Sequence, residues 1–137
     1  MTNEITIFLG IPAILIDKIT LRKIQTQRED FPGRFTKAGF TEKIDLNLIV
    51  DYTLQQIIYI ICHECTHSFL FRKRLWFSNN DENEVFTEIA SVYLGFGKYL
   101  KEGCKRIQKD LMFYTLGYIT PNEVEYLRKA LTPHMTP

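Results

Sequence analysis

The fold is decided by residues 52–72, which read YTLQQIIYIICHECTHSFLFR. Apolar side chains recur there at intervals of three and four residues, and neither glycine nor proline interrupts the run. This periodicity predicts a long and largely buried helix. The centre of the same segment carries two histidines and a glutamate among isoleucine, phenylalanine and leucine. Such polar groups are costly to bury without a partner, which makes this helix the first place to look for a functional site.

The centre of the segment is His63-Glu64-Cys65-Thr66-His67, an H-E-x-x-H motif. At about 100° per residue the two histidines lie about 40° apart on one helix face and one turn apart in height, so both rings can reach a single ion. Glu64 points about 100° away from His63, close enough to touch a water on the metal. A random order of the chain would produce the motif only about 0.5% of the time. The motif predicts zinc bound by His63 and His67 with Glu64 as general base. The bland alternative is two structural histidines beside a solvated carboxylate.

A hydrolytic zinc site needs a third protein ligand and one open position. No histidine follows His67 until His134, so the third ligand is predicted to be a carboxylate. Residues 82–100 are predicted to form a second helix, and the candidates in it are Glu82, Glu84 and Glu88. Glu84 and Glu88 share a helix face, so one can bind the ion while the other accepts a hydrogen bond from a ligand histidine. The alternative is a solvated acidic turn, which the helix dipole favours at an N-terminus.

These two segments resemble the gluzincin metallopeptidases, the thermolysin-like clan with its minimal minigluzincin members. Their second helix carries an N-E-x-x-S-D or E-x-x-x-D pattern, and residues 83–88 read NEVFTE. The resemblance covers roughly residues 35–100. It makes Glu84 the third zinc ligand and Glu88 the side chain that contacts a ligand histidine. Glu88 stands where the family usually has Asp, and a shifted register would make Glu88 itself the ligand.

The resemblance implies an α+β, zincin-like fold. In that fold a small antiparallel or mixed sheet packs on the long active-site helix and on the glutamate helix, with additional helices toward the C-terminus. The strand candidate at 43–48 is similar in position to the family's edge strand, which binds an extended peptide by backbone pairing. An ordinary core strand is an equally good interpretation of these residues.

The activity implied is that of a zinc-dependent metallopeptidase acting on a peptide or protein substrate. The ion would activate a water and polarise the substrate carbonyl, while Glu64 takes the proton and passes it to the leaving amine. A donor to the developing oxyanion is also needed, and the sequence does not select among Tyr93, Tyr99 and Tyr114. His134 in the tail is a candidate to cap the open zinc position.

The remaining segments complete the expected order of elements. Alternating polar and apolar residues predict short strands at 4–9, 14–21, 34–40 and 43–48. Residues 105–116 are predicted to form a third helix. The capping box Thr120-Pro121-Asn122-Glu123 predicts the start of a fourth helix that runs to about Leu131. We expect a single domain that is mainly β over 1–51 and mainly α over 52–131, followed by an irregular tail at 132–137.

Composition excludes several classes of function. The 17 basic and 16 acidic side chains nearly cancel to a formal charge of +1, so no strong field is available to hold nucleic acid or an anionic membrane surface. The longest strongly apolar run, 57–62, is far shorter than the ~20 residues that span a bilayer. No basic region marks a signal peptide, and three cysteines do not form a disulfide framework. We therefore expect a cytoplasmic protein with free thiols.

A second class of function stays open. A non-catalytic zinc-binding module of the same fold would act as a regulatory or toxin-like interaction protein. The 137 residues leave little material for the lower part of a substrate cleft, so an oligomer or a partner chain could complete it. The presence of Glu64 favours catalysis, because a purely structural site has no use for a base beside the metal.

Overall fold

The computed structural model describes residues 18–24, 32–39, 41–49, 52–104, 106–109 and 112–131. Its helices and strands confirm the predicted α+β class. The predicted strand at 4–9 and the tail at 132–137, which includes His134, lie outside the described residues. Within the described ranges, every helix is too short or too polar to cross a bilayer. The expected single domain stays a prediction.

Three strands form a mixed sheet in the order β1-β3-β2. β1 (Lys18–Ile24) runs parallel to β3 (Thr41–Ile49), and β2 (Gly33–Ala38) runs antiparallel to β3. The strands predicted at 34–40 and 43–48 are thus confirmed within one or two residues. Because β3 has a partner on each side, residues 43–48 form a core strand and their interpretation as an edge strand is wrong. Among the described strands, β2 lies at an edge of this sheet.

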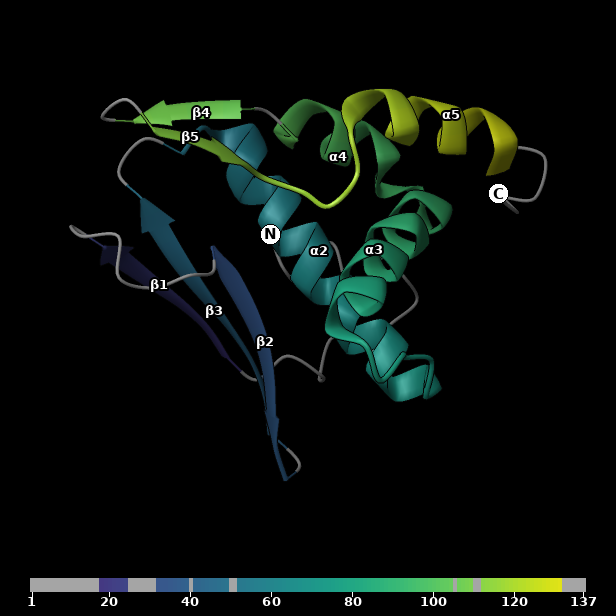
Figure 1. Cartoon of the computed structure of the whole chain (residues 1–137). Coiled ribbons are helices and arrows are strands. Elements are labelled where there is room, and N and C mark those ends of the chain that lie inside the picture. Colours follow the sequence, from purple (N-terminus) through teal and green to yellow (C-terminus); the bar gives the residue numbers. More distant parts are fainter. Residues whose placement is uncertain are drawn as a thin grey trace.

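Helix α2 (Leu54–Lys73) confirms the long helix predicted at 52–72. It begins at a capping box, in which Thr53 and Gln56 each accept a hydrogen bond from the other's backbone N–H, and it ends at Arg74, whose φ is 58°. Figure 1 shows α2 between the three-stranded sheet and helix α3 (Asn80–Ser91), and both neighbours contact it. The apolar core gathers around α2 and includes Ile44, Leu46, Ile60, Leu100 and Val124.

The second helix, predicted at 82–100, is interrupted. Helix α3 passes into a π-helical turn, η2 (Val92–Phe96), which is followed by α4 (Gly97–Gly103). Gly95 causes the interruption, because its φ of 95° is outside the helical region and favours glycine. The bend brings α4 back against α2 near the N-terminal end of that helix (Figure 1).

The third helix, predicted at 105–116, is wrong. These residues form an antiparallel pair of strands, β4 (Arg106–Lys109) and β5 (Met112–Thr115). A short segment with isoleucine, phenylalanine, tyrosine and threonine suits a pleated strand, and spacing alone does not separate the two states in so short a run. The fourth helix is confirmed as α5 (Pro121–Leu131), and Thr120 and Glu123 make the predicted capping box.

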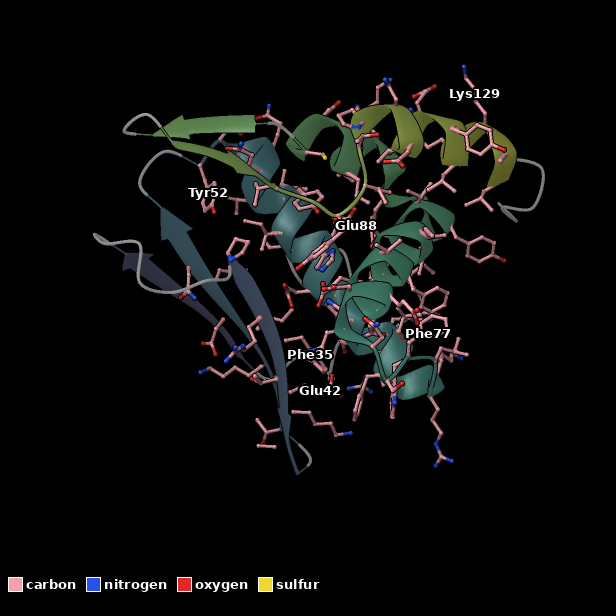
Figure 2. All side chains as sticks on the ribbon, in the orientation of Figure 1. Phe35, Glu42, Tyr52, Phe77, Glu88 and Lys129 are labelled. Carbon is pink, nitrogen blue, oxygen red and sulfur yellow. The ribbon has the colours of Figure 1, made fainter. Side chains whose placement is uncertain are left out.

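A buried carboxylate fastens the sheet to α2. Glu42 on β3 is only 1% exposed, and Figure 2 labels it between the sheet and the helix. Its Oε2 accepts a hydrogen bond from the Ser68 hydroxyl at 2.7 Å and lies 2.7 Å from Nη2 of Arg72. A buried charge needs such partners, because an ion without them is strongly destabilising. These contacts position the half of α2 that follows the H-E-x-x-H motif.

We expect Glu42→Gln to lower the free energy of unfolding by about 2 kcal/mol, because the amide removes the negative charge that lies 2.7 Å from Nη2 of Arg72. Chemical denaturation measures the change. Glu102→Gln is the matched control, since Glu102 is only half-buried and lies 4.0 Å from Lys98, and it should change the free energy of unfolding by less than about 0.5 kcal/mol. Equal losses in the two variants would contradict a fastening role for Glu42.

Candidate metal centre

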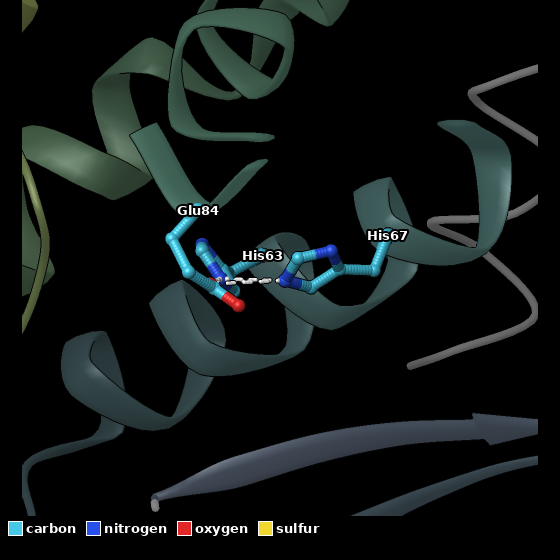
Figure 3. A group of neighbouring side chains, drawn as sticks. All are labelled: His63, His67 and Glu84. Carbon is cyan, nitrogen blue, oxygen red and sulfur yellow. Dashed lines mark hydrogen bonds and ion pairs between the residues drawn. The ribbon is translucent and has the colours of Figure 1, made fainter. Parts of the chain in front are cut away.

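Two helices bring three of the predicted site residues together. His63 and His67 project from α2, and Glu84 projects from α3 toward both of them (Figure 3). Nε2 of His63 lies 2.9 Å from Oε2 of Glu84, and Nε2 of His67 lies 3.1 Å from the same oxygen. The two Nε2 atoms are 3.0 Å apart. This group could hold a metal ion.

The size of this triangle fits zinc. Zinc–ligand bonds of about 2.0–2.1 Å in a tetrahedral site separate neighbouring ligand atoms by about 3.3 Å. The three observed separations are a few tenths of an ångström shorter, so small side-chain rotations would admit the ion. Two imidazoles and one carboxylate are also a donor set found in catalytic zinc sites, where the fourth position is open to water or substrate.

The charges around the two imidazoles favour a cation. Partial burial acts to raise the pKa of Glu84, but hydrogen bonds from His63 and His67 lower it to about 2, so this carboxylate is ionised at neutral pH. Burial acts to lower the pKa of His63, but the hydrogen bond to Glu84 raises it above its ordinary value. The charges of Glu64 and Glu88 act in the same direction. A divalent ion among these carboxylates would offset their mutual repulsion.

Thr87 sets the orientation of the His67 ring. The Thr87 hydroxyl donates to the Asn83 carbonyl at 2.7 Å, and its oxygen lies 3.1 Å from Nδ1 of His67. Because the hydroxyl proton is already used, Nδ1 is the donor in this contact. That leaves Nε2, which faces Oε2 of Glu84 at 3.1 Å, as the nitrogen that would bind a metal once the ion displaces the proton between them.

Glu88 lies next to His63 but has other hydrogen-bond donors. Its Oε1 is 3.8 Å from Nδ1 of His63, and that nitrogen is buried without a hydrogen-bond partner among the described residues. The Glu88 carboxylate instead accepts hydrogen bonds from the Tyr59 hydroxyl, from the Tyr118 backbone N–H at 2.9 Å and from the Ile119 N–H at 2.8 Å. The structure therefore places Glu88 beside His63, but without the expected hydrogen bond between them.

Glu64 is buried on the side of α2 that faces β2. Burial raises its pKa, and the charges of His63 and His67 and a hydrogen bond from the Phe35 backbone N–H oppose that rise without cancelling it. Gly33 makes the approach of β2 feasible, because a Cβ at this position would lie only 2.9 Å from Oε1 of Glu64. The carboxylate is thus buried and held beside the histidines.

A tyrosine other than the three candidates named from the sequence lies beside the cluster. Tyr93 in η2 and Tyr99 in α4 are 50% and 42% exposed, and the side chain of Tyr114 is outside the described ones. Tyr118 instead stacks on His63, with ring centroids 6.1 Å apart and an interplanar angle of 18°. Tyr118 was not among the residues predicted from the sequence, because only a long-range contact brings it to the site.

The cysteines that flank the histidines are buried and have raised pKa values. Cys62 and Cys65 are buried free thiols in the middle of α2. Burial raises the pKa of each to about 12, so both are protonated at neutral pH. A protonated thiol is neither a good nucleophile nor a good zinc ligand, which leaves the histidines and Glu84 as the candidate ligands here.

No family model, curated protein or solved structure matches this chain. The gluzincin resemblance therefore rests on the two helix motifs alone. The functional conclusion depends on the geometry of the cluster and on its chemistry.

We expect Glu84→Gln to weaken zinc binding by more than about a hundredfold, because it removes a charged ligand, whereas a change to a supporting side chain costs about 10–100-fold. Competition with a chromophoric chelator measures the affinity. Glu82→Gln is the control, since Glu82 is exposed on the same helix, and it should leave the affinity unchanged. If Glu88→Gln weakened zinc binding more than Glu84→Gln, the shifted register would be correct.

Proposed function

We propose that this chain is a zinc metallopeptidase with a zincin-like fold, which hydrolyses peptide bonds with Glu64 as the general base. The observation that carries the proposal is the convergence of His63, His67 and Glu84 from two adjacent helices, with Glu64 buried beside them. A buried carboxylate with a raised pKa next to candidate metal ligands is typical of a reactive site.

Bound zinc would supply a Lewis acid that lowers the pKa of a water and polarises the substrate carbonyl. Glu64 would remove the proton from the attacking water and return it to the leaving amine. The hydrogen bond from the Phe35 N–H keeps the carboxylate in place during these steps.

The neighbouring strand supports a polypeptide substrate. β2 pairs only with β3 among the described strands, so its other edge is free within this part of the chain. The Phe35 N–H bonds to Glu64, so the general base lies beside the backbone of β2. An extended peptide added along β2 would bring its own backbone close to that base.

We expect Glu64→Gln to retain about one zinc per chain and to lose at least about a hundredfold in the rate of cleavage, because the amide cannot accept the proton. His63→Ala should lose the metal together with activity. Elemental analysis of the reconstituted protein and cleavage of an unstructured, fluorescently labelled polypeptide measure the two quantities.

Glu102→Gln, on the surface of α4, is the control and should match the wild type in both assays. Zinc bound by wild-type protein that cleaves no polypeptide would refute the peptidase and favour the non-catalytic module. Protein that takes up no zinc would refute both functions.

A further inference from the structure

Glu88 ties α3 to the segment that leads into α5. The side chain is fully buried, and Figure 2 labels it between α3, α2 and that segment. Two consecutive backbone N–H groups, those of Tyr118 and Ile119, donate to its two oxygens at 2.9 Å and 2.8 Å. The Tyr59 hydroxyl supplies a third donor from α2. Charge-assisted hydrogen bonds of this kind are strong, so Glu88 fixes the turn at 117–119.

The backbone of this turn is suited to a close approach to the Glu88 carboxylate. Gly117 has a φ of 105°, and a Cβ there would lie 3.0 Å from Sγ of Cys104 and 3.3 Å from Oε1 of Glu88. Only glycine allows the backbone to pass so close to the carboxylate. The Cys104 thiol also donates to the Ile119 carbonyl at 3.1 Å. Leu116 and Ile119, on either side of the turn, are buried in the core.

Tyr118 is the side chain that this fixed turn presents to the site. It is 55% exposed between buried neighbours, and its ring stacks on that of His63. Its phenolic hydroxyl is a hydrogen-bond donor, and its exposure leaves it accessible to a substrate beside the cluster.

We propose that Tyr118 contacts the substrate and donates a hydrogen bond to the oxyanion that develops at the scissile carbonyl, and that Glu88 is the positioning residue that holds it there. The inference rests on the function proposed above. The proton stays on the phenol oxygen throughout, so the contact stabilises charge without transferring a proton. One such donor contributes about 10²–10³ in kcat.

The first test is Tyr118→Phe, which keeps the ring on His63 and removes only the hydroxyl. We expect kcat to fall by about 10²-fold, with KM and zinc content unchanged, because the hydrogen bond strengthens only as charge develops. Tyr126→Phe is the matched control, since Tyr126 is 72% exposed on α5, and it should leave kcat unchanged. Unchanged kcat in Tyr118→Phe, measured against an active wild type, would overturn the inference and leave the proposed function standing.

The positioning role of Glu88 is tested by Glu88→Asp and Glu88→Gln. Asp keeps the charge near His63 but is too short to reach both amides of the turn, whereas Gln keeps the length and loses the charge. In either variant the amides of Tyr118 and Ile119 should exchange with solvent at least about tenfold faster, because their acceptor is lost or weakened. We expect kcat to fall in both, while zinc affinity changes by less than about tenfold.

A double-mutant cycle shows whether Glu88 acts through Tyr118. If it does, Glu88→Asp combined with Tyr118→Phe lowers kcat hardly more than Tyr118→Phe alone. Losses that multiply would mean that Glu88 acts on His63 directly and would overturn the positioning role, as would full activity in Glu88→Asp. Zinc-loaded wild-type protein without any cleavage would refute the proposed function and this inference together. This result is distinguishable from the variant results above, which all require an active wild type.

Discussion

The structure depends on a row of hydrogen bonds buried between α2 and α3. The Ser91 hydroxyl shares its proton between Oγ1 of Thr66 and the Thr87 carbonyl, each at 2.8 Å, and the Thr66 hydroxyl donates its own proton to the Cys62 carbonyl. Further along the same interface, Thr87 contacts Nδ1 of His67. A buried polar group that loses its partner costs about 1–3 kcal/mol, so sliding one helix along the other would break several contacts at once. Apolar side chains tolerate such slippage better, because their attraction has no direction. The polar row therefore fixes the register that the metal ligands need.

That register explains how the candidate metal centre is assembled from separate elements. The candidate ligands come from two helices whose mutual position is set by Thr66, Thr87 and Ser91, and Glu64, the proposed general base, lies on the face of α2 toward β2. The sheet is fastened independently, through Glu42 to the last turns of α2. Helix α3 and the sheet thus each contact α2 through polar side chains of their own. An ion that binds the folded chain and not the unfolded one would add to the stability of all of them by mass action.

The sequence predicts the parts of this arrangement that are local. Helix α2 and the pairing of His63 with His67 follow from periodicity within about twenty residues, and Glu84 follows from the small number of carboxylates on the next helix. The strands β4 and β5 were mistaken for a helix because a short apolar run is compatible with both states, and only the pairing of the two strands decides. Tyr118 was missed for a related reason, since its place depends on hydrogen bonds to a residue thirty positions earlier in the chain. No periodic pattern encodes a contact of that range.

At Glu88 the second helix departs from the gluzincin pattern that it resembles, which usually has Asp there. The structure shows what the longer side chain contacts instead. In that pattern an aspartate contacts a ligand histidine. Here the longer side chain carries its carboxylate to the turn at 117–119, where two backbone N–H groups point at it, and leaves Oε1 3.8 Å from Nδ1 of His63. A carboxylate has enough lone pairs for several donors, but it cannot approach all of them equally. With Glu at position 88, the carboxylate forms its hydrogen bonds with the backbone N–H groups of the turn. The His63 ring is instead held by the rings of Tyr59 and Tyr118, which stack on it at centroid distances of 6.2 Å and 6.1 Å.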